Sequence, residues 1–226
     1  MSDARSLRVL LVDDHALLAD AVAAALRAEG IDVRIADLSS RDDLLASVEA
    51  DPPDLALLDL DLGGAIGDGS TLVRPIVRAG ARVLVVSASR RRAQVGTAIE
   101  QGAVGHLNKS EPLHELIATV VAAARGDEVM APARRQAILQ ELYALREQES
   151  EARKPFERLT AREQQVLREL GNGKVVTTIA EEWFVSEATV RSQVRGVLTK
   201  LGVSSQLEAV ALALRVGWLV DPRRRG

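Results

Sequence analysis

The sequence predicts a doubly wound, five-stranded parallel α/β sheet followed by a small all-α helix-turn-helix domain. Over residues 1–126, short apolar runs alternate with amphipathic stretches of helix length, which is typical of parallel strands joined by crossover helices. From residue 158 onward the apolar periodicity is helical throughout. Residues 127–157 lie between these regions and are polar and helix-prone, so we expect them to form a helical linker.

Each element of the first domain is predicted by its own pattern. The strands are short apolar runs, at residues 8–12, 32–36, 54–59, 82–87 and 103–107. The helices are the amphipathic stretches after each strand, at about 16–28, 40–50, 70–79, 90–101 and 111–125. The glycine-rich segment 63–69 is expected to be a loop in which the backbone closely approaches other groups.

The linker is expected to be helical over residues 133–153. Gly126 and Pro132 precede it, and Pro155 is expected to end it. Its apolar face, with which a second copy of the helix can pair, carries Ile138, Leu142 and Leu145.

In the second domain, capping residues predict where helices begin. Thr160 and Glu163 form a capping box at the start of the first helix. A short helix at 177–183, a three-residue corner and a longer helix from Ser186 to Leu201 then predict a helix-turn-helix. The final helix, at 204–216, is expected to turn one face to the core, carrying Leu207, Val210, Ala211 and Leu214.

The composition bounds the class of protein. The 226 residues are 47% hydrophobic and 27% charged, which is typical of a globular chain. There is no apolar run of the roughly 18 residues that a membrane span needs and no signal-peptide pattern, so we expect a cytoplasmic protein without a membrane partner. The lack of cysteine excludes disulfides, zinc-thiolate sites and thiol catalysis. Three scattered histidines argue against a histidine-based metal site.

The net charge of −3 is unevenly distributed. Residues 1–126 carry 13 basic and 18 acidic side chains, whereas residues 158–226 carry 11 basic and 7 acidic. This asymmetry favours a polyanionic partner for the second domain. The run Arg223, Arg224 and Arg225 is either a phosphate-contacting tail or a solubilising end.

Five polar residues stand at the carboxyl ends of predicted strands: Asp13, Asp14, Asp59, Ser87 and Lys109. Such strand ends open into one crevice, so we expect these side chains to converge. Neighbouring carboxylates repel each other, and a hard divalent cation such as Mg²⁺ relieves that repulsion. The set predicts phosphoryl transfer, in which Asp59 attacks phosphorus, Lys109 and the cation neutralise the phosphoryl oxygens, and Ser87 donates a hydrogen bond to one of them.

The polar face of the longer helix in the second domain predicts binding to double-stranded DNA. Arginine pairs with guanine or phosphate, glutamine with adenine, and hydroxyl groups with phosphate oxygens. Its position as the second helix of a tight pair favours DNA contact over an ordinary solvated helix face. The candidate DNA-binding residues are Thr189, Arg191, Ser192, Gln193, Arg195 and Lys200.

Both halves resemble known bacterial domains. The motifs VLLVDDH, LLDLDL, VVSA and GHLNK resemble the receiver domain of response regulators. The stretches LTAREQQVLREL and IAEEWFVSEATVRSQVRGVLTKLGV resemble the LuxR-type helix-turn-helix. Over nearly the whole chain, the sequence therefore resembles the NarL/FixJ class of two-component regulators.

The resemblance implies a transcriptional regulator rather than an enzyme. It implies a receiver at 1–126, a linker at 127–157 and a DNA-binding domain at 158–226. A partner sensor histidine kinase would phosphorylate the receiver, and the active form would be a homodimer. The implied phospho-acceptor is Asp59, the implied Mg²⁺ ligands are Asp14, Asp59 and the Asp61 carbonyl with Asp13 nearby, and the implied phosphoryl-contacting and switch residues are Ser87, Lys109 and His106.

The sequence departs from the family pattern at four places. Gly63 replaces a proline four residues after the phospho-acceptor, so we expect a looser loop on the metal side. His106 replaces the aromatic residue three positions before the lysine, which puts the usual switching readout in doubt. The residues 174–176 replace a polar run, and Gln193 stands where a histidine is common, which can alter sequence preference.

Two alternatives stay open from the sequence. One is a regulator of the same architecture that works without phosphorylation. The other is a haloacid-dehalogenase-type phosphatase, because Asp59 and Asp61 imitate its DxD signature. That family places DxD on the first strand, whereas here the acidic pair comes first, which argues against it.

Overall fold

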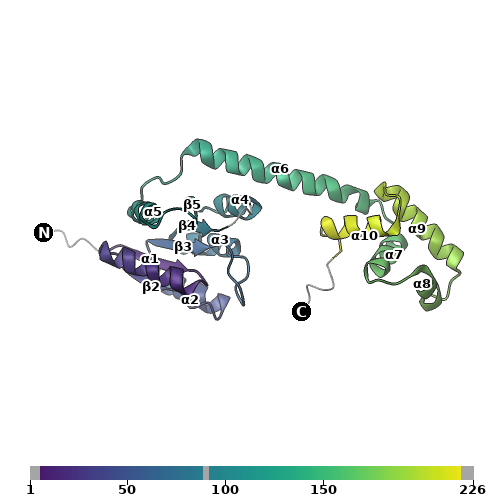
Figure 1. The fold of residues 1–226 in the computed structure, drawn as a ribbon, viewed down its shortest axis with the longest axis horizontal. Coiled ribbons are helices and arrows are strands. Elements are labelled where there is room, and N and C mark those ends of the chain that lie inside the picture. Colours follow the sequence, from purple (N-terminus) through teal and green to yellow (C-terminus); the bar gives the residue numbers. More distant parts are fainter. Residues whose placement is uncertain (1–5, 89–91, 220–226) are drawn as a thin grey trace. The chain divides into compact units, whose positions relative to one another are not determined.

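The computed structural model describes residues 6–88 and 92–219, and the chain divides into two compact units, residues 1–144 and 145–226 (Figure 1). The run Arg223, Arg224 and Arg225, for which we predicted a tail, lies outside the described residues. So does the beginning of the helix expected at 90–101.

The first unit contains a five-stranded parallel sheet in the order β2-β1-β3-β4-β5. This order reverses direction at β1, as in the doubly wound folds that bind ligands at the strands' carboxyl ends. The predicted fold class is thus confirmed. The strands are β1 (Arg8–Val12), β2 (Asp32–Ile35), β3 (Leu55–Asp59), β4 (Arg82–Ser87) and β5 (Gly105–Asn108).

Helices cover both faces of this sheet, because successive strand residues point to opposite sides. Leu10 and Val12 pack with the helices of one face, and Val9 and Leu11 with those of the other. The first face is covered by α2 (Arg41–Ala50), α3 (Ser70–Arg78) and α4 (Arg92–Glu100), and the second by α1 (Ala16–Ala28) and α5 (Leu113–Arg125). The packing of these two buried cores therefore fixes the position of the strand ends that form the crevice.

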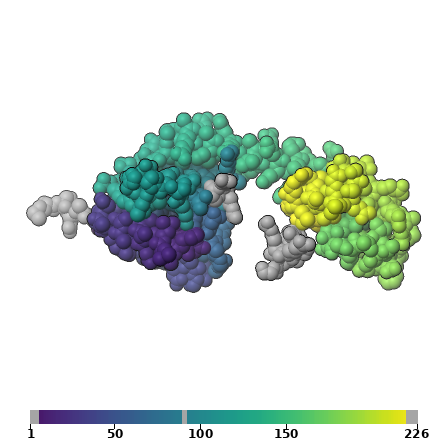
Figure 2. Space-filling model, in the orientation of Figure 1, coloured from purple at the N-terminus to yellow at the C-terminus, as the bar shows by residue number. Residues whose placement is uncertain are grey.

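The linker forms one helix, α6 (Pro132–Glu157), and two expectations about it are wrong. Pro155 does not end it, since the last turn is held by Phe156, which is 1% exposed and packs in the core of the second unit. Leu142 is 2% exposed and packs against Gly96 of α4. The first half of α6 therefore buries its apolar face on its own unit, where Figure 2 shows it in green, rather than on a second copy.

Besides the end of α6, the described part of the second unit contains the helices α7 (Ala161–Gly171), α8 (Val176–Glu182), α9 (Glu187–Leu201) and α10 (Gln206–Arg215). The predicted capping box of Thr160 and Glu163 is confirmed. In α10 the predicted core face is confirmed only at Val210, which packs against the core: Ala209 and Ala213 are buried, whereas Leu207 is 79% exposed. The helix packs closely on α7 and α9, and such close approach admits small side chains.

Among the described residues, no single helix is long and apolar enough to cross a membrane. Taken together, α9 and α10 reach the length and apolar content of a span, with a bend of 53° between them.

Candidate functional site

The sheet brings all five predicted crevice residues to one edge. Asp59 and Ser87 are the last residues of β3 and β4, and both are buried, at 2% and 1% exposure. Asp13 and Asp14 directly follow β1, and Lys109 directly follows β5. The strand ends thus place three carboxylates, an ammonium group and a hydroxyl group in the first unit's crevice.

Lys109 forms ion pairs with two of the three carboxylates. Its Nζ lies 2.7 Å from Asp13 Oδ2 and 2.7 Å from Asp59 Oδ2, and its side chain is 10% exposed. Burial by itself lowers the pKa of Lys109, but the hydrogen bonds to Asp13 and Asp59 outweigh it and raise that pKa above its usual value. The ammonium group is therefore charged and already placed on an oxygen of Asp59.

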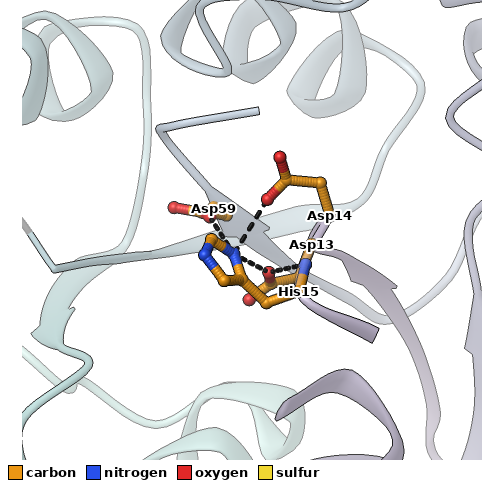
Figure 3. A group of neighbouring side chains, drawn as sticks. All are labelled: Asp13, Asp14, His15 and Asp59. Atoms are coloured by element: carbon orange, nitrogen blue, oxygen red, sulfur yellow. Dashed lines mark hydrogen bonds and ion pairs between the residues drawn. The ribbon is translucent and has the colours of Figure 1, made fainter. Parts of the chain in front are cut away.

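His15 joins this cluster, which was not predicted, because the three histidines lie far apart in the sequence. Its Nδ1 lies 2.8 Å from Asp14 Oδ1, 3.1 Å from Asp13 Oδ1 and 3.7 Å from Asp59 Oδ2. Figure 3 shows the imidazole among the three carboxylates, although 63% of the side chain is exposed. The signal that was available is its place directly after the acidic pair.

The donor atoms of this cluster fit a divalent cation. Asp13, Asp14, His15 and Asp59 each offer one ligand atom, and these atoms all lie within 4.8 Å of one another. Within residues 6–88 and 92–219, these three carboxylates face the single charge of Lys109, which leaves negative charge for a cation to balance. Carboxylate and carbonyl oxygens are the ligands that Mg²⁺ prefers.

The glycine-rich loop after β3 packs against the site, as expected. A Cβ on Gly69 would lie 2.1 Å from the Asp59 carbonyl oxygen, so only glycine fits there. The Asp61 amide donates to Asp59 Oδ1 (3.1 Å), and the Gly63 amide donates to Asp14 Oδ2 (3.0 Å). Gly63, where we expected a looser loop, thus ties the loop to the acidic pair.

His106 contacts the buried hydroxyl. Its Nε2 lies 3.1 Å from Ser87 Oγ, across neighbouring strands. Burial lowers the pKa of His106, as does the positive charge of Arg134 on α6, while Glu111 raises it by a smaller amount. The ring is therefore held towards its neutral form, with its Nε2 on Ser87.

The second unit presents the predicted helix-turn-helix. Helix α8 begins without a side-chain cap after Val175, and Lys174 pairs with Glu182 (2.6 Å) at its other end. Ser186 caps α9 by accepting from the Thr189 amide (3.2 Å). The corner between the helices holds Phe184 at a φ of 54° and 95% exposed.

The predicted DNA-binding residues of α9 differ in their surroundings. Arg191 is exposed but pairs with Glu187 (2.7 Å), and Gln193 is half-buried. Arg195 is exposed and makes no ion pair with any residue that the structure describes. Thr189 and Ser192 are exposed on the same helix.

Lys200 forms an ion pair with a nearly buried carboxylate of the second unit. Its Nζ lies 2.6 Å from Oε2 of Glu163, whose side chain is 9% exposed. Burial raises the pKa of Glu163, but Lys200 and Thr160 outweigh it and lower that pKa. A Cβ on Gly196 would lie 2.3 Å from Glu163 Oε1, so α9 packs tightly on this carboxylate. The sequence showed Glu163 as a cap but not as the partner of Lys200.

Comparisons with known proteins agree with this architecture. Residues 9–121 match the model of the response regulator receiver domain, and residues 157–213 match that of the luxR family of bacterial regulatory proteins. The chain is 33% identical over 208 residues to the probable transcriptional regulatory protein NarL of Mycobacterium tuberculosis, covering 92% of this chain and 94% of that protein.

Two further relatives have similar coverage. The nitrate/nitrite response regulator protein homolog of Haemophilus influenzae is 29% identical over 206 residues, with 91% and 95% coverage. The crystal structure of the response regulator ChrA from a heme-sensing two-component system is 30% identical, with a TM-score of 0.43 and coverage of 95% and 99%. With a receiver fold and a LuxR-type helix-turn-helix in one chain, the protein belongs to the NarL/FixJ class of response regulators and is a two-component transcriptional regulator.

Proposed function

We propose that this regulator is switched by Mg²⁺-dependent phosphorylation of Asp59, with a sensor histidine kinase as the donor. The observation that carries the proposal is the Asp59 carboxylate itself, which is buried and in contact with the Lys109 ammonium group (2.7 Å). A buried carboxylate that faces a cation at a strand end is placed for attack on phosphorus.

In the reaction, an oxygen of Asp59 forms a bond to phosphorus, and the bond from phosphorus to the kinase's histidine nitrogen breaks. That nitrogen keeps the electron pair and the phosphoryl group stays on Asp59. Lys109 stabilises the charge on the phosphoryl oxygens, and Ser87 donates a hydrogen bond to one of them. The chain itself is then the acceptor rather than an enzyme that acts on other substrates.

Mg²⁺ would be held by Asp14, Asp59 and the carbonyl of Asp61, with Asp13 nearby. When bound, it supplies charge neutralisation at the phosphoryl oxygens. In this proposal, the Ser87 hydroxyl exchanges its contact with His106 for a hydrogen bond to the phosphoryl group. The imidazole of His106 then changes its own contacts in response. The contact of 3.1 Å between Ser87 and His106 supports this step.

We further propose receiver, linker and DNA-binding functions for residues 1–126, 127–157 and 158–226. Double-stranded DNA would be bound through α9 by a homodimer, since helix-turn-helix operators are mostly two-fold symmetric. The exposed Arg195 supports α9 as the contact surface, along with Thr189 and Ser192. Arg191 and Gln193 are proposed with them, and Lys200 last, because it is paired with Glu163.

Uptake of phosphate from acetyl phosphate in the presence of Mg²⁺ tests the proposal, read by intact-mass spectrometry. Wild type should become singly phosphorylated, and Asp59→Asn should not, since the amide is a far weaker nucleophile of the same shape. Asp61→Asn is the matched control and should retain uptake, because the carbonyl of this residue, not its carboxylate, is the proposed ligand. Equal uptake in Asp59→Asn would refute the assignment, and no uptake by wild type would favour a phosphorylation-independent regulator.

A further inference from the structure

The metal-side aspartate, Asp14, is held by the protein through both of its oxygens. The Gly63 amide donates to Oδ2 at 3.0 Å, and His15 Nδ1 lies 2.8 Å from Oδ1. Figure 3 shows the contact with His15 as a dashed line. A cation that binds Asp14 must therefore displace one of these partners or share an oxygen with it.

The two partners differ in how easily they move. His15 is a side chain with 63% exposure, so rotation about its own bonds frees Oδ1. The Gly63 amide belongs to a loop that is fixed at both ends. Gly69 donates to the Leu60 carbonyl (3.0 Å) and lies against the Asp59 backbone, and Leu62 is 2% exposed. The backbone donor therefore stays in place when the imidazole leaves.

We propose that Gly63 is a positioning residue for the cation: its amide holds Oδ2 of Asp14 and leaves Oδ1, the oxygen now on His15, for the metal. A proline at this position would have no amide proton to donate. In this chain a hydrogen bond from the loop thus orients the ligand. Partners that orient a metal ligand in this way typically change metal affinity about 10- to 100-fold.

The inference rests on the proposed function, because it presumes that the crevice binds Mg²⁺. Titration calorimetry of the full chain with Mg²⁺ alone, at pH 8, separates the two. If wild type takes up no Mg²⁺, the proposed metal site fails. If wild type binds Mg²⁺ and the variants below do not differ, only the role of Gly63 fails.

The decisive pair is Gly63→Pro and Gly63→Ala. Both add a side chain, and a Cβ here would lie 3.2 Å from Asp14 Oδ2, but only proline removes the donor. Gly63→Pro should bind Mg²⁺ about tenfold more weakly than Gly63→Ala, because only the proline variant loses the group that orients Asp14. Equal affinities in the two variants would overturn the proposal.

Two further measurements guard against a folding defect. Amide hydrogen exchange of Gly63 should speed up about tenfold in Asp14→Ala, which keeps the loop sequence intact; unchanged protection would contradict the hydrogen bond. His15→Ala should bind Mg²⁺ a few-fold more tightly than wild type, because Oδ1 then has no partner to lose. Weaker binding in His15→Ala would mean that the imidazole assists the cation, and would overturn the division of roles.

Discussion

The crevice of the first unit and the face of α9 in the second both carry charge at proposed functional positions, but they balance it differently. In the described part of the crevice, the carboxylates of Asp13, Asp14 and Asp59 face one ammonium group, that of Lys109. On α9, Arg191 already pairs with Glu187 and Lys200 with Glu163. The crevice therefore keeps negative charge with which to bind a ligand, whereas on α9 two of the basic side chains are already paired with glutamates of the same unit.

The charged side chains of the two regions therefore contribute differently to ligand binding. Clustered carboxylates that outnumber the neighbouring cations favour the binding of a metal. A surface cation that is paired with a glutamate must give up that pair before it meets a phosphate, so its net contribution to binding is smaller. The number of basic residues on α9 therefore overstates the positive charge that is free to meet DNA.

The largest expected effect concerns the crevice. Asp14→Ala should weaken Mg²⁺ binding by more than about 100-fold, since loss of a direct ligand exceeds the 10- to 100-fold effect of a supporting partner. It should slow phosphate uptake without abolishing it, because Asp59 remains. Calorimetry checks the affinity, with Asp20→Ala on the exposed face of α1 as the control. If Asp14→Ala bound Mg²⁺ with wild-type affinity, the excess negative charge of the crevice would not explain metal binding.

The next effect separates stability from binding on α9. Lys200→Ala should lower the free energy of unfolding by about 1–3 kcal/mol, because it leaves the buried carboxylate of Glu163 short of a partner. Since the pKa of Glu163 is lowered in the folded chain, the pair's contribution is present above the unfolded carboxyl pKa and is lost as the pH falls through the folded one.

Urea unfolding followed by circular dichroism measures the loss in Lys200→Ala, and gel shifts on duplex DNA measure binding. DNA affinity should change little. A large loss of affinity with unchanged stability would mean that Lys200 contacts DNA as strongly as the other proposed residues, despite its pair with Glu163.

The free and paired arginines of α9 should differ in DNA affinity. Arg195→Ala should cost about 1–3 kcal/mol of binding if the side chain reads a base, or reduce the salt slope by about 1 if it contacts phosphate. Arg191→Ala should cost less, since Glu187 is its present partner. Glu187→Ala should strengthen binding by releasing Arg191.

Gel shifts over a salt series distinguish these outcomes, using the same duplex for all three variants. If Arg191→Ala proves as costly as Arg195→Ala, the pairing seen on α9 has no bearing on DNA binding.

The smallest effect is the pH dependence of His106. Burial lowers its pKa, so the unfolded state binds more protons, and the stability of the first unit should fall as the pH drops from 8 to 6. His106→Tyr should lack that component, and phosphorylation-dependent dimerisation should follow the same trend. Urea unfolding and sedimentation at both pH values measure the two, with the exposed His114→Ala as the control. Parallel pH profiles in wild type and His106→Tyr would exclude a switching histidine.

The order of the elements and the crevice residues other than His15 were predictable from the sequence alone. Apolar runs of strand length that end in Asp13, Asp59 and Ser87 suffice, because parallel strands joined by crossover helices have only one edge at which their carboxyl ends meet. The helix-turn-helix was likewise predictable from local signals such as the cap at Ser186 and the glycine after Leu201.

The partner that each polar group takes became apparent only in the folded chain. Nothing local to Lys200 or Glu163 reveals their pairing across 37 residues, and nothing local to Gly63 reveals its hydrogen bond to Asp14, 49 residues away. Local patterns report whether a residue lies in a strand, a cap or a loop. The pairing of charges and donors depends instead on distances that exist only after the cores have packed, and it is this pairing that divides the residues with charge to offer a ligand from those that stabilise the fold.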